Sequence, residues 1–221
     1  MTNSSSNTPG SARLRIAVIG TGNLASTLGA TWVRSGQELS VFGRSFDRAA
    51  AVANEIGGTA IAASSVRAHD LVVLAVSPDG VQEALTLVGA PGGALAGVPL
   101  IDTTNPIDWT TGRHLLASGS FAEQVAHWAP GSLVVKALQS YAGHMWLNSP
   151  DPERTVALCG DDPAALELVA RAVTALGGLS LVVGGLEVAR QAEEATAFVA
   201  RIAAAGGNPR LTVPALQPNR R

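Results

Sequence analysis

The sequence feature that most constrains the fold lies near the N-terminus, where an apolar run ends in a glycine-rich turn. Residues 14–19 read LRIAVI, a short run rich in β-branched side chains that is typical of a buried strand. Residues 20–25 follow as GTGNLA, and from Leu24 to Ser35 apolar side chains recur at helical spacing. This order of strand, glycine turn and helix is typical of the first unit of a parallel sheet covered by helices.

The alternation of strand and helix patterns continues through the rest of the chain. Short apolar runs predict further strands at 38–42, 59–62, 70–76, 98–102, 133–138, 155–159 and 179–183. Helical periodicity predicts helices at 46–55, 81–88, 163–176 and 187–204. Nearly continuous apolar strands are covered on both faces, so we predict a Rossmann-like, doubly wound and mostly parallel α/β sheet. Because no linker divides the chain, we expect a single domain at 13–206 between tails at 1–12 and 207–221.

Composition excludes several classes of protein. The chain has 221 residues, of which 47% are apolar, and its formal net charge is −2. This apolar share is enough to form a hydrophobic core. The net charge does not indicate binding to nucleic acid or to an anionic membrane. No uncharged stretch reaches the about 20 residues that a membrane-spanning helix needs. Residues 1–12 lack the basic and apolar parts of a secretory signal, and Cys159 is the single cysteine, so we expect a cytoplasmic protein.

The glycines of the first turn carry the first functional hypothesis. Gly20 permits a tight turn, Gly22 lets the backbone approach a pyrophosphate, and Ala25 allows close packing of helix on strand. The N–H groups that open the helix then face the anion. In its position between a strand and a helix, the motif predicts a dinucleotide site.

The end of the predicted second strand indicates which dinucleotide binds. An NAD site usually places Asp or Glu there, about 20 residues after the glycines, to accept hydrogen bonds from the ribose. Residues 41–45 read VFGRS and contain no acid. Arg44 can contact a 2′-phosphate, Ser45 can donate to it, and Arg48 lies one helical turn further on the same side. We therefore predict NADP(H) as the cofactor.

Two further polar turns follow predicted strands. Residues 75–79 read AVSPD and residues 102–106 read DTTNP. Ligands of open α/β sheets lie beyond the carboxyl ends of the strands, although ordinary turns also favour these residue types. Four residues are expected to touch the cofactor, the first two at its ribose or pyrophosphate and the last two near its nicotinamide: Ser77, Pro78, Thr104 and Asn105.

The motifs, taken in order, resemble the F420-dependent NADP oxidoreductase family. The resemblance rests on GTGNL at 20–24, GRSFDRA at 43–49, VVLAVSPD at 72–79, DTTNP at 102–106, VVKAL at 134–138 and CGDD at 159–162. It implies a homodimer that moves a hydride between NADP(H) and coenzyme F420, a deazaflavin. It also implies roles for particular residues: Thr21, Asn23 and Leu24 at the pyrophosphate, Arg44, Ser45 and Arg48 at the 2′-phosphate, and the residues after Val134 around the nicotinamide and the second ring system.

The stretch 109–146 differs chemically from the rest, because it holds five of the nine aromatic residues and three of the four histidines. Lys136, the only lysine of the chain, ends an apolar strand there. A half-buried lysine could donate to a substrate carbonyl or a deazaflavin oxygen, or it could snorkel from the edge of the strand. Tyr141 and His144 are candidate proton donors on the following loop, with an ordinary loop role as the alternative.

The identity of the hydride acceptor stays open between several classes. A deazaflavin comes first, followed by a flavin or a small organic substrate with a C=C, C=N or C=O bond. A non-catalytic NADP sensor is the alternative of another class. Pyrroline-carboxylate reductases and hydroxyacid dehydrogenases share the glycine unit but need an all-helical C-terminal half, whereas strands and helices alternate here to the end. No spacing suits a metal site, and hydride transfer between rings needs little acid–base chemistry.

Overall fold

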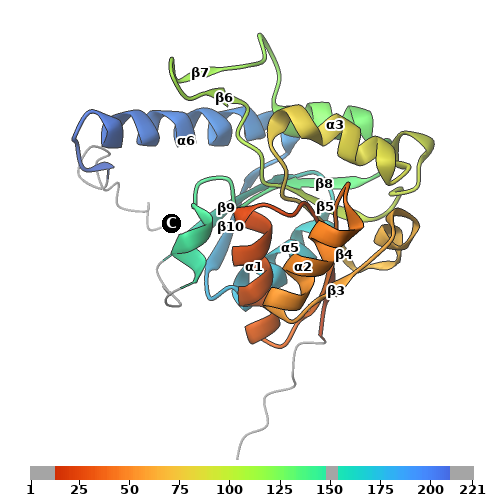
Figure 1. Cartoon of the computed structure of the whole chain (residues 1–221). Helices are drawn as coiled ribbons and strands as arrows, with labels where there is room; N and C mark the ends of the chain where they lie inside the picture. Colours follow the sequence, from red (N-terminus) through yellow and green to blue (C-terminus); the bar gives the residue numbers. More distant parts are fainter. Residues whose placement is uncertain (1–12, 148–153, 210–221) are drawn as a thin grey trace, which may run out of the picture.

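The computed structural model describes residues 13–147 and 154–209, which form a sheet between two layers of helices (Figure 1). The eight-stranded sheet has the order β10-β9-β8-β5-β4-β1-β2-β3. Its strands are β1 Arg15–Ile19, β2 Glu38–Phe42, β3 Thr59–Ala60, β4 Leu71–Leu74, β5 Pro99–Asp102, β8 Leu133–Lys136, β9 Thr155–Gly160 and β10 Leu179–Gly184. The predicted Rossmann-like fold is confirmed.

The direction of the strands defines where a ligand can bind. Neighbouring strands run parallel except for β8 and β9, which pair antiparallel. The chain builds outward from β1 through β2 and β3, then returns to the other side of β1 with β4. The order of the strands therefore reverses between β1 and β4, and the crevice beyond the carboxyl ends at such a reversal is the usual ligand site.

Helices cover both faces because the strands are apolar on both sides. In β1, Ile16 and Val18 join one core cluster, while Ala17 and Ile19 join the other. The first cluster includes side chains of α1 Asn23–Arg34, α2 Phe46–Ile56 and α5 Pro163–Ala175. The second includes side chains of α3 Pro78–Leu87, α4 Phe121–Trp128 and α6 Ala189–Ala204. Short 3₁₀ turns are η1 Ala63–Ala68, η2 Ala90–Gly92, η3 Gly143–Trp146 and η4 Leu186–Val188.

Two elements were absent from the sequence prediction. A small antiparallel hairpin pairs β6 Ile107–Asp108 with β7 Arg113–His114, and it stands next to α6 at the top of Figure 1. Helix α4 is preceded by its N-cap Ser120, whose side chain forms a reciprocal capping box with that of Glu123. The sequence SFAE at 120–123 carries this signal, which could have located the helix.

The predicted tails lie largely outside the described residues, namely 1–12 entirely and 207–221 from residue 210 onward. Of the helices within the described ranges, none has the length and apolar character needed to cross a membrane.

Candidate functional site

The glycine turn after β1 depends on its first glycine. Gly20 has φ +137°, and a Cβ atom built on it would lie 2.2 Å from the carbonyl oxygen of Ala75 at the end of β4. A side chain is therefore excluded on both conformational and steric grounds. The close approach brings the turn after β1 directly against the end of β4, where the strand order reverses.

The N-terminus of α1 offers hydrogen-bond donors to an anion. Gly22 is the N-cap residue and no side chain caps this end of the helix. A Cβ atom on Gly22 would meet nothing within 4 Å, so the approach to the backbone is open. The first turn of α1 contains no acidic residue. The first N–H groups of the helix and its positive dipole end suit a pyrophosphate, as the motif predicts.

A cavity of about 220 Å³ lies on one side of this turn. It is lined by the turn itself and by the carboxyl ends of β2 and β4, through residues that include Thr21, Gly43, Arg44, Val76 and Ser77. These residues surround the point where the strand order reverses. The cavity thus occupies the place where the adenosine ribose of a dinucleotide would lie.

Arg44 lies at the outer end of this small cavity and is already paired. Its Nη1 atom is 2.9 Å from Oε2 of Glu83 on α3, and the two side chains are 73% and 55% exposed. The neighbouring Ser45 caps α2, since its Oγ atom accepts a hydrogen bond from the backbone N–H of Arg48. Ser45 and Arg48 are exposed and do not line the cavity, although they lie one and four residues after Arg44.

The turn after β4 adds polar groups to the same cavity. Ser77 lines it, while Pro78 is the first residue of α3. The pKa of Asp79 lies below its ordinary value, first because the Ser77 side chain hydrogen-bonds its carboxylate and further because backbone N–H groups do so. Asp79 also feels the charge of Arg44. An acid therefore stands near the cavity but is exposed to solvent.

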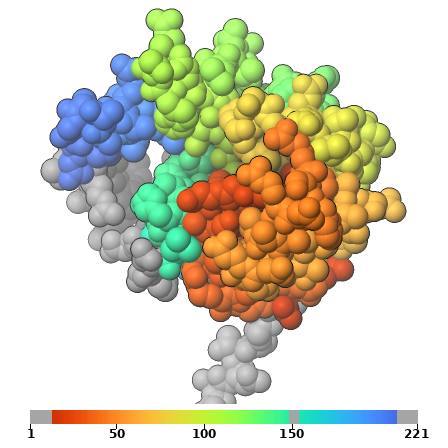
Figure 2. All heavy atoms as spheres, in the orientation of Figure 1, coloured from red at the N-terminus to blue at the C-terminus, as the bar shows by residue number. Residues whose placement is uncertain are grey.

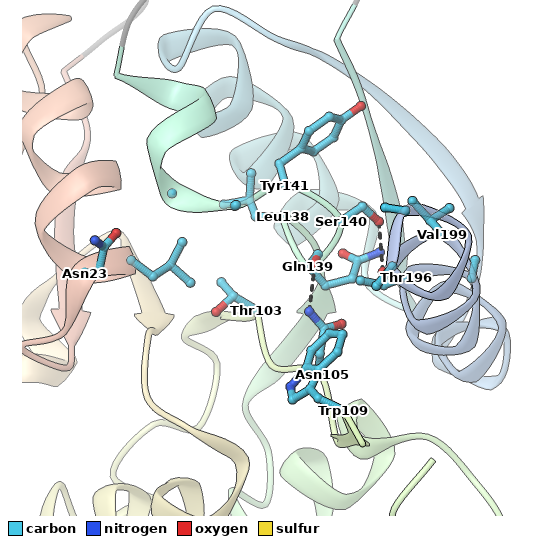
Figure 3. A pocket seen from close by; sticks show the side chains of 16 residues that line it. Asn23, Thr103, Asn105, Trp109, Leu138, Gln139, Ser140, Tyr141, Thr196 and Val199 are labelled. Carbon is cyan, nitrogen blue, oxygen red and sulfur yellow. Dashed lines mark hydrogen bonds between the residues drawn. The ribbon is translucent and has the colours of Figure 1, made fainter. Parts of the chain in front are cut away.

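A larger cavity of about 560 Å³ lies on the other side of the turn (Figures 2 and 3). In the space-filling view the surface is hollowed between α6 and the segment around η3. The cavity is lined by residues of α1, the turn after β5, the hairpin, the loop after β8 and α6: Asn23, Leu24, Thr103, Asn105, Trp109, Leu138, Gln139, Ser140, Tyr141, Ala142, Gly143, Ala195, Thr196, Val199, Ala200 and Ala203. None of these residues carries a charged side chain.

Hydrogen bonds fix the turn after β5, but one of its two residues expected at the cofactor is turned into the protein. Asn105 lines the large cavity and donates from Nδ2 to the backbone oxygen of Gln139 at 2.7 Å. Thr104, predicted to face the nicotinamide, is buried and donates its hydroxyl to Asp102 Oδ1 at 2.6 Å. Its neighbour Thr103 lines the cavity instead. Two residues of this turn therefore line the cavity, and the inward hydrogen bond of Thr104 leaves Thr103 as the threonine that does so.

Lys136 is completely buried rather than half-buried. Its Nζ atom lies 2.9 Å from Asp102 Oδ2 and 2.9 Å from Glu193 Oε1, and it also donates to the backbone oxygen of Thr104. It does not line either cavity. The expectation that this ammonium touches the acceptor is corrected accordingly, because its partners Asp102, Glu193 and the Thr104 backbone lie inside the protein.

Of the two other candidate proton donors, one lines the large cavity with its hydroxyl bonded to the backbone, and the other lies outside the cavity. The ring of Tyr141 lines the large cavity, but its hydroxyl donates to the backbone oxygen of Thr155 at 2.9 Å, and in Figure 3 the ring extends away from Thr103 and Asn105. His144 is exposed on η3 and does not line the cavity. These positions disagree with proton donation by either residue to a ligand in the cavity.

Several lining residues escaped the sequence analysis. Leu138 has φ +65°, a left-handed conformation that is uncommon for a residue other than glycine, and it turns the chain from β8 into the cavity wall. Thr196 of α6 faces Ser140 across the wall, with their hydroxyl oxygens 3.2 Å apart. No local pattern marks these residues, because their proximity depends on the packing of α6 against the end of β8. Among the described residues, no group of His, Cys, Asp and Glu could hold a metal ion.

With this geometry in place, comparison with known proteins identifies the first part of the chain. Residues 15–106 match the family model described as "NADP oxidoreductase coenzyme F420-dependent". This stretch is similar to the proteins of that family. The matched residues run from β1 to the turn after β5, so they include the glycine turn, Arg44 and Ser77. The family resemblance expected from the motifs is confirmed over these residues.

Other similar proteins match a larger share of the chain. The chain is 28% identical over 180 residues to the metalloreductase STEAP3 of Rattus norvegicus, a match that covers 81% of this chain and 36% of that protein. A solved structure, hypothetical protein SMa0349 from Sinorhizobium meliloti, has a TM-score of 0.71 at 24% identity and covers 80% of this chain and 89% of that one. The reductive aminase from Aspergillus terreus, solved with NADPH and ethyl-5-oxohexanoate, has a TM-score of 0.66 at 16% identity and covers 88% and 64%. The structural matches show the shared fold.

Proposed function

We propose that this chain binds NADP(H) across the glycine turn and transfers a hydride between NADPH and a deazaflavin, coenzyme F420. The observation that carries the proposal is the position of the turn. One cavity with an arginine at its rim lies on one side, and a larger uncharged cavity lies on the other. A dinucleotide that bridges them would place its two halves in environments that suit a phosphorylated ribose and a flat, uncharged ring.

The described residues fit the cofactor along its length. The open backbone at Gly22 and the start of α1 would hold the pyrophosphate. Arg44 would contact the 2′-phosphate, with Ser45 and Arg48 beside it, and Ser77 would lie at the ribose. At the other end Asn105, together with Thr103, would border the nicotinamide, which supplies the hydride when the cofactor is bound.

The large cavity supports an acceptor that needs no proton from the protein. Its walls include the flat or apolar side chains of Trp109, Leu138 and Val199. Of the expected proton donors, His144 lies outside the cavity, and Tyr141 lines it but donates its hydroxyl to the backbone oxygen of Thr155. Hydride transfer between two ring carbons requires close stacking and exclusion of water rather than acid–base groups. A deazaflavin meets this condition. A flavin also does, and the experiment must therefore separate the two.

NADPH oxidation measured at 340 nm tests the proposal. F420, FMN and a cyclic imine are offered as acceptors under the same conditions, after NADPH binding has been measured by calorimetry. We expect rapid oxidation with F420 and slow oxidation with the other two. Faster turnover with FMN or the imine would replace the deazaflavin by that acceptor, whereas tight binding without turnover would indicate a non-catalytic NADP sensor.

We also propose that the chain assembles as a homodimer through α6 and the neighbouring hairpin. Trp109 and Leu115, at the hairpin, are 60% and 59% exposed, and Phe198 on α6 is 57% exposed. Large exposed apolar side chains on adjoining elements are typical of an interaction surface. We expect light scattering at micromolar concentration to give twice the mass of the chain, and Phe198→Glu to give the monomer. A monomeric wild-type chain would contradict this.

A further inference from the structure

The turn after β5 is fixed by two buried charges. Lys136 ends β8 and Asp102 ends β5, and the side chains of both are 0% exposed. Asp102 Oδ1 accepts hydrogen bonds from the backbone N–H and the hydroxyl of Thr104, at 2.9 and 2.6 Å. Lys136 donates to Asp102 Oδ2 and to the backbone oxygen of Thr104. Both polar groups of the Thr104 backbone are thus held by this ion pair.

Glu193 of α6 completes the cluster from the opposite side. Its Oε1 atom lies 2.9 Å from Lys136 Nζ, and its Oε2 atom lies 2.7 Å from Nε2 of His114 on β7. The backbone N–H of Phe121, at the start of α4, donates to both oxygens at 3.1 Å. The Glu193 side chain is 0% exposed, and that of His114 is 3% exposed. One carboxylate therefore connects α6 to β7, to α4 and, through Lys136, to the turn after β5.

The elements joined by Glu193 are the walls of the large cavity. Thr103 and Asn105 flank the held Thr104, and both line that cavity. The loop between β6 and β7 contributes Trp109, and α6 contributes Thr196 less than one turn after Glu193. Bonds that meet at the Glu193 side chain, directly or through Lys136, therefore connect three walls of the cavity, while Glu193 itself lies outside it.

A contribution to the stability of the fold is by itself a weak explanation for this buried cluster of ionisable side chains. Removing charges from water is costly, and well-packed apolar residues often replace a buried ion pair without loss of stability. Apolar packing, however, provides no directional bond to the backbone oxygen of Thr104 or to the ring of His114. The cluster supplies fixed geometry between distant segments, and this geometry lies directly beneath the larger cavity.

We propose that Glu193 is a positioning residue for the large cavity, where the nicotinamide would lie. It acts through Lys136 on the Thr104 turn and through His114 on the hairpin. The inference rests on the proposed binding of NADP(H). It assigns no contact between Glu193 and the ligand. It requires that loss of the carboxylate disturb the large cavity while the small cavity at Arg44 stays intact, because no bond of the cluster reaches the small cavity.

Calorimetry with two ligands distinguishes binding in the large cavity from binding in the small cavity. NADPH occupies both cavities, whereas 2′,5′-ADP carries the phosphorylated adenosine and lacks the nicotinamide. The variant Glu193→Gln keeps the shape of the side chain and leaves Lys136 paired with Asp102. Its matched control is Glu194→Gln, which changes the next residue of α6, a half-exposed partner of Arg190. Thermal melts show that each variant is folded at the temperature of the measurement.

We expect Glu193→Gln to weaken NADPH binding about tenfold and to change 2′,5′-ADP binding less than twofold, while Glu194→Gln changes neither. Amide hydrogen exchange should become faster at Thr104 and stay unchanged at 20–25. Equal weakening of both ligands, or no change in either, would overturn the positioning role. A wild-type chain that binds neither ligand would overturn the proposed function and this inference with it, which distinguishes the two failures.

Discussion

The two cavities on either side of the α1 N-terminus are built in different ways. The small cavity is formed by three consecutive strand ends of the family-matched region, and its charged residue, Arg44, forms an exposed ion pair with Glu83. The large cavity draws on segments between Asn23 and Ala203, and beneath it lies a buried cluster of four ionisable side chains. We infer that the first half is a local, tolerant binding site and that the second depends on long-range packing.

The largest effect that distinguishes the two cavities is expected from a substitution at Lys136. Lys136→Met leaves Asp102 and Glu193 without their shared cation, and breaking a buried pair in this way costs about 3–5 kcal/mol. We expect a decrease of that size in the free energy of unfolding, measured by urea denaturation. Arg15→Met is the matched control, because the exposed pair of Arg15 with Asp70 contributes at most about 1 kcal/mol. Similar decreases in the free energy of unfolding of both variants would contradict the proposed difference between the two cavities.

A second prediction concerns the turn that separates the cavities. Gly20→Ala introduces a Cβ atom at 2.2 Å from the Ala75 oxygen in a conformation that disfavours side chains. We expect a loss of about 1–3 kcal/mol of stability from backbone strain, together with loss of detectable NADPH binding. Gly22→Ala, where a Cβ meets no atom of the protein, is the control for stability. The prediction fails if Gly20→Ala is as stable as Gly22→Ala.

A third prediction concerns the choice of cofactor in the small cavity. Arg44→Ala should weaken NADPH binding by about 1.5–3 kcal/mol, the range for hydrogen bonds to charged groups, because it removes the cation assigned to the 2′-phosphate. NADH binding, which involves no such phosphate, should stay nearly unchanged. Calorimetry with both cofactors measures the ratio of the dissociation constants for NADPH and NADH. An equal loss for NADPH and NADH would show that Arg44 does not recognise the phosphate.

The smallest expected effect concerns Glu83, which forms an ion pair with Arg44. Its carboxylate would compete with the 2′-phosphate for the guanidinium, so Glu83→Gln should tighten NADPH binding. The gain should be at most about 1 kcal/mol, since both side chains are largely exposed to water. Glu55→Gln, near the far end of α2, is the control. Weaker NADPH binding in Glu83→Gln would indicate that Glu83 orients Arg44 rather than competing for it.

The local sequence determined the sheet, the glycine turn and the small cavity. Strand and helix periodicity give the alternating elements, and the start of α5 is marked locally by its N-cap Asp162 followed by Pro163. The turn from Gly20 and the polar ends of β2 and β4 could be located because ligand sites in such sheets follow from strand direction. In each case the information lies within a few residues of the chain.

The tertiary structure alone decided the larger cavity and the environment of Lys136. The side chain was expected near a ligand because it is the only lysine in an apolar setting, yet Asp102 and Glu193 enclose it from segments 34 and 57 residues away in sequence. Glu193 lies in a helix whose apolar periodicity gives no sign that one of its acids is buried. Such contacts depend on how α6 and the hairpin pack over the strand ends, and a pairing between distant residues leaves no periodic trace in one sequence.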